Sequence, residues 1–96
     1  MGQNVYITEV PTVADVKVYV TSTPTIADVI VYKAPSAIYP GIDENKGIWR
    51  FVDIQTIANK TIFYTDVPTI ADLKVYFTND PMRAGWIDDS KKKLME

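Results

Sequence analysis

The sequence predicts an all-β domain, a compact closed repeat of six 13-residue units in which short strands alternate with turns or 3-10 connections. Three observations predict this fold class. Similar segments recur every 13 residues, the segment at each unit boundary alternates apolar and polar side chains, and a stretch that usually contains proline separates one such segment from the next. With 96 residues, 47% of them hydrophobic, the chain has the size and composition of a single domain with a packed core.

The units begin at residues 5, 18, 31, 49, 62 and 75, and a tail, residues 88–96, follows them. The fullest copies are VYITEVPTVADVK from Val5, VYVTSTPTIADVI from Val18 and IFYTDVPTIADLK from Ile62. Only the step from Val31 to Trp49 departs from the period, because it spans 18 residues. In the tail, three lysines are expected to be solvated, while Leu94 or Met95 docks on the domain.

Each strand is predicted to cross the boundary between two units. Val16, Val18 and Val20 alternate with polar or aromatic neighbours, which is the period-2 pattern of a strand with one buried face. We therefore expect these three valines to point into the core. The same alternation recurs from Leu73.

Each connection is predicted to be a turn or a short 3-10 segment, because proline cannot donate a hydrogen bond within a sheet. Thr23, before Pro24, is a candidate N-cap of such a turn. One apolar residue recurs per connection and is expected to plug the core: Val13, Ile26, Ile57 and Ile70. Alanine recurs at the next position and is expected to mark a close approach of segments: Ala14, Ala27, Ala58, Ala71 and Ala84.

The spacing of strands and links favours an up-and-down meander that closes into a ring of about six strands. Antiparallel neighbours can be joined by short links, whereas a parallel neighbour in the same sheet usually needs a crossover of about a dozen residues or more. Closure would also remove exposed strand edges.

Several motifs together resemble the septknot family of small bacterial proteins. They are the repeated Thr-Xaa-Xaa-Pro-Thr-Ile-Ala-Asp-Xaa-Lys-Val-Tyr pattern, the segment from Gly47 to Val52 (GIWRFV), the sequence Ala84-Gly85-Trp86, and SKKKL ending at Leu94. The resemblance covers nearly the whole chain, from Val5 to Leu94. The chain departs from the family where Pro-Thr-Ile replaces a more usual Lys-Ser-Glu, which affects the expected shape of the connections.

The resemblance implies a deep seven-crossing knot, in which successive units wind the chain through itself. Such a fold is not suggested by the spacing of the repeats, since knots are very rare among proteins. The resemblance adds no biochemical activity, because the family has no assigned role.

Charge and composition exclude several classes of partner. Ten basic and 12 acidic residues give a net charge of −2, which argues against nucleic acid and against an anionic membrane surface. The start of the chain lacks the pattern of a signal peptide, and no apolar stretch is long enough to cross a bilayer. We expect a soluble, cytoplasmic monomer whose partners, if any, the sequence does not identify.

The sequence also lacks the residues on which common catalytic sites depend. It contains no histidine and no cysteine, which excludes the usual nucleophilic triads and structural zinc sites, and its four glycines are scattered. We therefore predict no catalytic residues, no metal site and no cofactor, and we expect that the protein is not an enzyme.

Recurring acids follow the alanines in three units, at Asp15, Asp28 and Asp72, with Asn59 and Gly85 in register. Carboxylates gathered in a closed ring could bind Ca²⁺ or Mg²⁺. The simpler interpretation is that each acid accepts a hydrogen bond from its own backbone and starts the next strand.

Two features could form a binding surface. One is an aromatic row at the second position of the units, which could bind bases or sugars or simply shield the outer strand faces: Tyr6, Tyr19, Tyr32, Phe63 and Tyr76. The other is the central loop, residues 41–49, which could bind a partner through Asp43, Glu44 and Trp49 or could be a connector with Trp49 in the core.

Two functions remain open from the sequence. The first is a non-enzymatic, mechanically robust structural or interaction protein, suggested by the repeat and by the knot that the resemblance implies. The alternative is a small module that binds a ligand or protein through the aromatic row or the central loop.

Overall fold

The computed structural model describes residues 4–35 and 46–95, and within these ranges it consists of short strands and 3-10 turns. The prediction of an all-β fold is confirmed. Six strands form a closed ring: β1 (Asn4–Ile7), β2 (Val16–Val20), β3 (Val29–Lys33), β4 (Ile48–Phe51), β5 (Lys60–Tyr64) and β6 (Leu73–Thr78). A two-residue strand, β7 (Gly85–Trp86), and a 3-10 helix, η7 (Asp89–Met95), complete the described chain.

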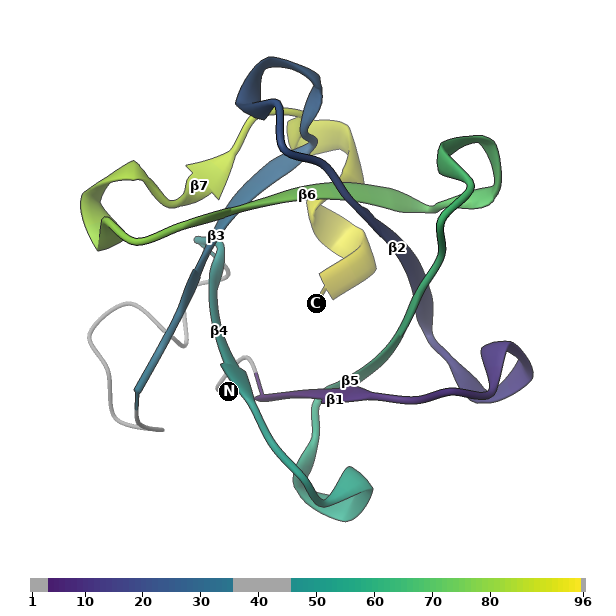
Figure 1. Ribbon diagram of the computed structural model, residues 1–96. Coiled ribbons are helices and arrows are strands. Elements are labelled where there is room, and N and C mark those ends of the chain that lie inside the picture. The colour runs from purple at the N-terminus through teal and green to yellow at the C-terminus, as the bar shows by residue number, and fades with distance from the viewer. Residues whose placement is uncertain (1–3, 36–45, 96) are drawn as a thin grey trace.

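Five 3-10 turns link these strands and project outward as the corners of the ring (Figure 1). They are η1 (Pro11–Val13), η2 (Pro24–Ile26), η4 (Gln55–Ile57), η5 (Pro68–Ile70) and η6 (Pro81–Arg83). Four of them begin with proline, whose fixed φ suits the first position of a helical turn. The expected 3-10 connections are therefore present.

The strands follow the order β1-β5-β2-β6-β3-β4 around the ring, and pairing between β4 and β1 closes it. All six neighbouring pairs are parallel, and only β7 runs antiparallel, beside β3. The chain thus places β1, β2 and β3 at alternate positions and later inserts β5 and β6 between them. The strands of each half of the chain interleave with those of the other half.

The predicted meander is wrong, because consecutive strands are parallel. β1 and β2 are not paired with each other, because β5 lies between them. The end of β1 and the start of β2 lie opposite the same residue of β5, so a short link can join them. The one connection between neighbouring ring strands, from β3 to β4, spans residues 34–47, which is the length that a parallel crossover needs. This is where the 13-residue period is interrupted.

The strands are staggered, so that the two halves of each strand pair with different neighbours. Ile62 of β5, for example, lies opposite both Ile7 of β1 and Val16 of β2. Val75 of β6 likewise lies opposite both Val20 and Val29. The residue that opens a unit therefore sits where one neighbouring strand ends and the next begins.

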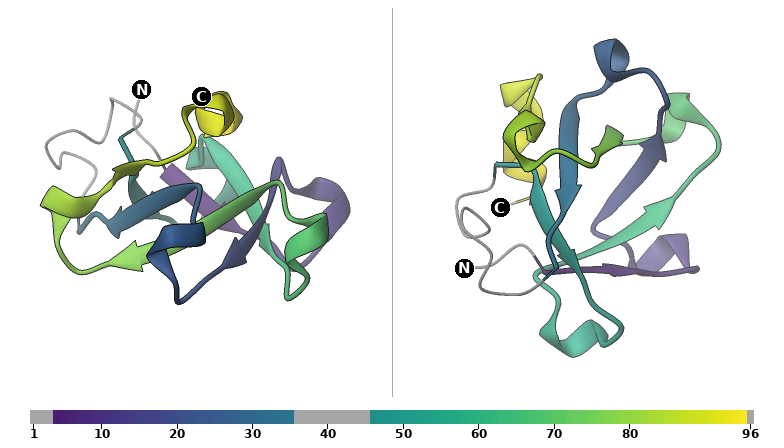
Figure 2. Two further views of the ribbon diagram at one scale, coloured as in Figure 1. Left: turned by 90° about the horizontal axis from the view of Figure 1, so that it is seen from above. Right: turned by 60° about the vertical axis from the view of Figure 1, so that its left-hand side comes forward.

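The core is built around the first residue of each unit. All six are 0% exposed: Val5, Val18, Val31, Trp49, Ile62 and Val75. Toward the starts of the strands, Val16, Val29 and Leu73 are also buried. In Figure 2, η7 lies on one side of the ring, and its Met95 is fully buried in the same cluster. The expected docking of the tail is thus confirmed at Met95.

The inward valine face is confirmed at Val16 and Val18 but not at Val20, which is 43% exposed because it lies at the open end of the barrel. The predicted core plugs are wrong. Val13, Ile26, Ile57 and Ile70 lie on the corners and are 48–54% exposed, because the first residues of the units already fill the core.

The recurring alanines close the turns. The N–H of each alanine donates to the carbonyl of the first residue of its turn, at 3.1–3.3 Å. Only Ala27 is buried and the other four are half-buried, so the expected close approach is limited to Ala27. Thr23 is the N-cap residue of η2, as predicted, but its side chain makes no capping hydrogen bond. The Thr23 N–H donates to Thr21 Oγ1.

Candidate functional site

The recurring acids join strands from the two halves of the chain. The Asp15 N–H donates to the Thr61 carbonyl at 2.7 Å, and the Thr61 N–H donates to Asp15 Oδ2 at 2.9 Å. The same two-bond clamp links Asp28 with Lys74, Asp72 with Lys17, and Asn59 with Asn4. As the simpler interpretation predicted, each of these side chains lies at the start of a strand. It accepts its hydrogen bond from a different strand, however, and not from its own backbone.

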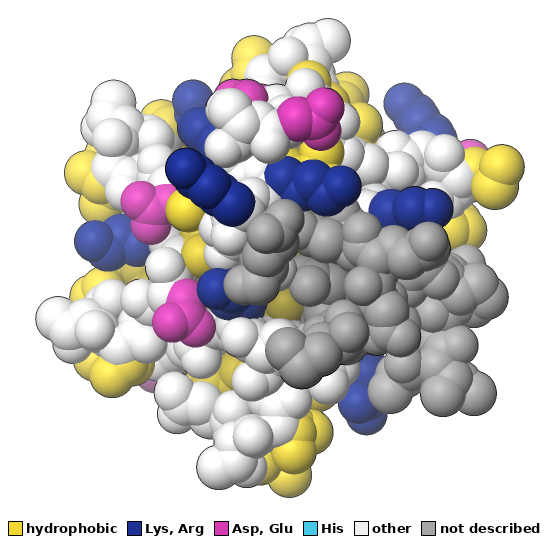
Figure 3. Space-filling model, turned by 180° about the vertical axis from the view of Figure 1, so that it is seen from behind, with side chains coloured by type: hydrophobic (Ala, Val, Ile, Leu, Met, Phe, Trp, Pro, Cys, Tyr) yellow, Lys and Arg dark blue, Asp and Glu magenta, His cyan; other side chains and the backbone are white. Residues whose placement is uncertain are grey.

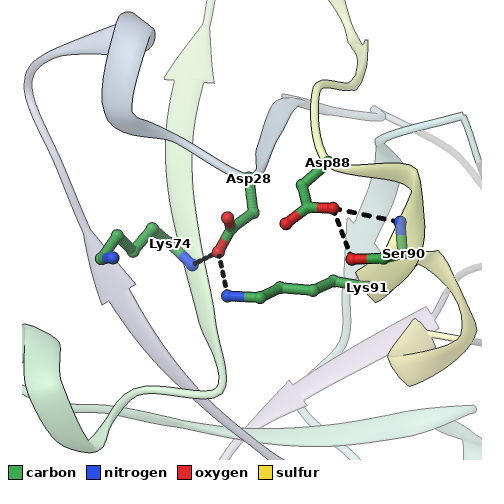
Figure 4. Close-up of polar contacts among 5 residues, drawn as sticks. All are labelled: Asp28, Lys74, Asp88, Ser90 and Lys91. Atoms are coloured by element: carbon green, nitrogen blue, oxygen red, sulfur yellow. Dashed lines mark hydrogen bonds and ion pairs between the residues drawn. The ribbon is translucent and has the colours of Figure 1, made fainter.

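The clamps leave the acids separated. Among the described residues, no three acidic side chains lie together in a way that could hold a cation. Asp28 has a further partner, because Lys91 Nζ of η7 lies 3.1 Å from its Oδ2 (Figure 4). Beside it, Asp88 accepts hydrogen bonds from the Ser90 hydroxyl and N–H, and these bonds lower the pKa of Asp88, the hydroxyl contributing most. The acids therefore fasten η7 and the strands together.

The aromatic row lies on the outer face of the ring, where its side chains are half-buried: Tyr6, Tyr19, Tyr32, Phe63 and Tyr76. Lysines are interleaved with it, since Tyr19 is in register with Lys74 and Phe63 with Lys17. Half-burial is compatible both with shielding of the strands and with binding, so the row stays a predicted binding surface.

Of the central loop, residues 41–49, the structure describes only residues 46–49. Asp43 and Glu44 lie outside the described residues. Trp49 is 0% exposed and packs edge-on against Phe51, with 6.3 Å between the ring centroids. Its ring belongs to the core, which removes Trp49 from the candidate binding surface. The indole Nε1 has no hydrogen-bond partner among the residues that the structure describes.

A surface that the sequence analysis missed lies where the six strands end. Because the strands are parallel, the third residues of all six units lie at the same end of the barrel, opposite the strand starts that η7 covers. We call this set the mouth: Ile7, Val20, Lys33, Phe51, Tyr64 and Phe77. Ile7 and Val20 are 39% and 43% exposed and Phe51 and Phe77 are half-buried, so apolar side chains remain accessible there.

Lys33 is the one charged residue of the mouth. Its Nζ lies 4.7 Å from the ring centroid of Phe77 and 5.3 Å from that of Phe51, as in a cation–π contact. Those two rings meet edge-on, with their centroids 6.0 Å apart. Partial burial raises the pKa of the Tyr64 hydroxyl above its ordinary value. In the sequence, the mouth corresponds to the third residue of each of the six units, and these residues are apolar or aromatic except for Lys33.

The described residues contain no helix long and apolar enough to span a membrane. In comparisons with known proteins, the model of a family described as the 7(1) septoil knot domain matches residues 2–87. No curated protein and no solved structure matches the chain.

Proposed function

The chain belongs to the septoil knot family, and on that premise we propose that it is a non-enzymatic, mechanically robust structural or interaction protein. The lack of histidine and cysteine supports the non-enzymatic part. The observation that carries the proposal is the interleaving of the two halves of the chain. The seven-crossing knot itself stays a prediction for this chain.

Interleaving favours slow unfolding because no strand of the ring can separate on its own. β5, for example, is hydrogen-bonded to both β1 and β2, so removing it breaks the ring on two sides. The clamps join residues 46 or 55 positions apart in the sequence. Contacts between such distant residues form together, and the unfolding barrier rises when many of them must break together.

The end of the chain is also fastened, which matters for a machine that pulls from a terminus. Met95 is buried in the core, and Lys91 of η7 is paired with Asp28 at the start of β3. A pulling force applied at this end would act first on buried contacts. The proposal therefore includes resistance to unfolding from the C-terminus.

The test is the unfolding rate in denaturant, followed by tryptophan fluorescence, to which the buried Trp49 and the half-buried Trp86 both contribute. We expect an extrapolated rate in water at or below about 10⁻⁶ s⁻¹, the slow limit of small domains. Reversible unfolding within milliseconds would overturn the proposal. A tagged chain should also stall an ATP-driven unfoldase that pulls from the C-terminus.

A control separates chain continuity from contact strength. A protease site inserted beside Thr25, in the exposed turn η2, allows the backbone to be cut after folding. If threading of the chain causes the slow unfolding, the cut protein should unfold at least about tenfold faster. Equal rates for the cut and intact proteins would assign the robustness to the contacts alone.

The alternative, a binding module, is favoured by the accessible apolar side chains of the mouth. The aromatic row could serve the same role. Chemical-shift mapping with a sugar library would test the row, and shifts at Tyr6, Tyr19, Tyr32 or Tyr76 would support it.

A further inference from the structure

Two sets of exposed apolar side chains on this molecule are unexplained by its core. One is the mouth, where Ile7, Val20 and Tyr64 are 39%, 43% and 36% exposed. The other lies on the corners, which spread around the outside of the ring (Figure 1). Seen from the side that carries η7, hydrophobic side chains are visible around the outer edge of the molecule (Figure 3). Contiguous exposed apolar surface commonly marks an interaction site.

Three corners share one composition. In each, an exposed acid is followed directly by an exposed valine or isoleucine, and a second one follows three residues later: Glu9, Val10 and Val13; Asp53, Ile54 and Ile57; Asp66, Val67 and Ile70. The six apolar side chains are 47–58% exposed. Each of these corners therefore offers a small apolar surface with one negative charge beside it.

The mouth has the opposite character. It is apolar apart from Lys33, whose Nζ contacts the Phe51 and Phe77 rings. Within residues 4–35 and 46–95, no acidic side chain is paired with it. The Lys33 ammonium group contacts the faces of two aromatic rings, and its N–H groups can still donate to a carboxylate. The apolar surroundings would strengthen an ion pair between Lys33 and such a carboxylate.

We propose that the mouth of one copy of this protein binds an acidic corner of a second copy. The Val and Ile side chains of the corner pack against the apolar side chains of the mouth, and the corner carboxylate pairs with Lys33. A second copy is the occupant because the chain itself carries both complementary surfaces, in charge and in apolar character. Each such contact covers the mouth of one copy and one acidic corner of the other.

The proposed contact is heterologous, because mouth and corner are different surfaces. Each copy has one mouth and three matching corners, so the contact can extend into rings or chains of molecules. One corner is small compared with a stable interface, so we expect a dissociation constant of roughly 0.1–1 mM. The protein is then a monomer when dilute, in agreement with the sequence-based expectation, and associates when concentrated.

The first test is sedimentation velocity between about 10 μM and 2 mM, concentrations that bracket the expected affinity. The average mass should rise above the 10.8 kDa of one chain and fall again at high salt. A constant mass of one chain over the whole range would overturn the proposal. Amide shifts that change with concentration should include Val20, Lys33 and Tyr64, and shifts confined to other surfaces would also overturn it.

Charge reversal provides the decisive test. Lys33→Glu gives an acidic mouth, and the triple variant Glu9→Lys, Asp53→Lys, Asp66→Lys gives basic corners. Each variant alone should associate at least about tenfold more weakly than the wild type. Mixing the two should restore association, because the acidic mouth then meets basic corners. Failure of the mixture to associate, or unchanged association of Lys33→Glu alone, would overturn the proposal.

The matched control is Lys93→Glu, which changes the net charge equally at an exposed site on η7. It should leave association unchanged, and an equal loss in this control would show that only net charge matters. If Lys33→Glu disturbs the fold by losing the contacts with Phe51 and Phe77, Lys33→Met preserves the apolar stem. That variant should lose the salt dependence of association, and retained salt dependence would contradict the assigned pair.

Discussion

Asp28 and Lys74 lie 46 residues apart in the sequence, yet two hydrogen bonds join them, one between the backbones and one from the Lys74 backbone to the Asp28 side chain. The Asp28 N–H donates to the Lys74 carbonyl at 2.8 Å. The Lys74 N–H donates to Asp28 Oδ2, also at 2.8 Å (Figure 4). The same carboxylate oxygen accepts from Lys91 Nζ at 3.1 Å. A single buried side chain thus connects β3, β6 and η7.

Replacing Asp28 should separate its role as a hydrogen-bond acceptor from its charge. Asp28→Ala leaves the Lys74 N–H without its partner, and we expect the free energy of unfolding to fall by about 2–3 kcal/mol. Asp28→Asn keeps an acceptor, as Asn59 does in its own clamp, and should cost about 1 kcal/mol. Equilibrium denaturation measures both. Equal losses would mean that the Lys91 pair, and not the clamp, carries the effect.

Gly47 and Gly85 form a matched pair for a test of backbone fit. Gly47 has a φ of +82°, and a Cβ added there would lie 2.5 Å from the Ile30 carbonyl oxygen. Gly47→Ala should therefore lower the free energy of unfolding by about 3 kcal/mol or more. A Cβ added at Gly85 meets no atom within 4 Å, so Gly85→Ala should stay within about 0.5 kcal/mol. Similar losses at both sites, measured by thermal unfolding, would contradict this packing.

Met95 should behave as a core residue although it lies near the end of the chain. Its side chain is 0% exposed and packs in the main cluster. Met95→Ala is expected to cost about 2–5 kcal/mol, the range for large-to-small changes in a core. Hydrogen exchange should quicken at Val16, Val29 and Leu73, which belong to the same cluster. Lys93→Ala, at an exposed position of η7, is the control and should change neither quantity.

Acid should loosen the start of η7. The hydrogen bonds from Ser90 lower the pKa of Asp88, so the folded state releases this proton more readily than the unfolded state does. The resulting stabilisation is present above the ordinary pKa of an aspartate and is lost as the pH falls through the lowered value. An NMR titration should show the Ser90 amide shifting together with the Asp88 carboxyl. Ser90→Ala should raise that pKa, and an unchanged titration would contradict the assignment.

The sequence predicted local features well because they depend on neighbours along the chain. Alternation placed Val16 and Val18 in the core, and proline located four of the turns. The sequence did not predict the features that depend on which strands are neighbours in the ring. Asp28 was correctly placed at a strand start, but its partner Lys74 is fixed by the order of strands around the ring.

The same limitation explains the errors at the ends of the strands. Val20 has the same alternation as Val16 and Val18, yet only its position at the mouth exposes it. Ile26 and Ile70 look like core anchors because they recur, but recurrence also marks a surface that is repeated around a ring. Whether a recurring apolar residue faces inward or outward depends on how much space the other residues leave in the core.

The order of strands has a consequence for biosynthesis. None of β1, β2 and β3 pairs with another of the three, since their ring partners are β4, β5 and β6. While a ribosome is making the first half of the chain, those segments have no sheet to join. Their backbone groups must stay with solvent, or with a chaperone, until the second half emerges. A messenger RNA truncated near its middle would therefore yield a polypeptide without a native strand pair. Such a polypeptide would be unfolded and susceptible to proteolysis.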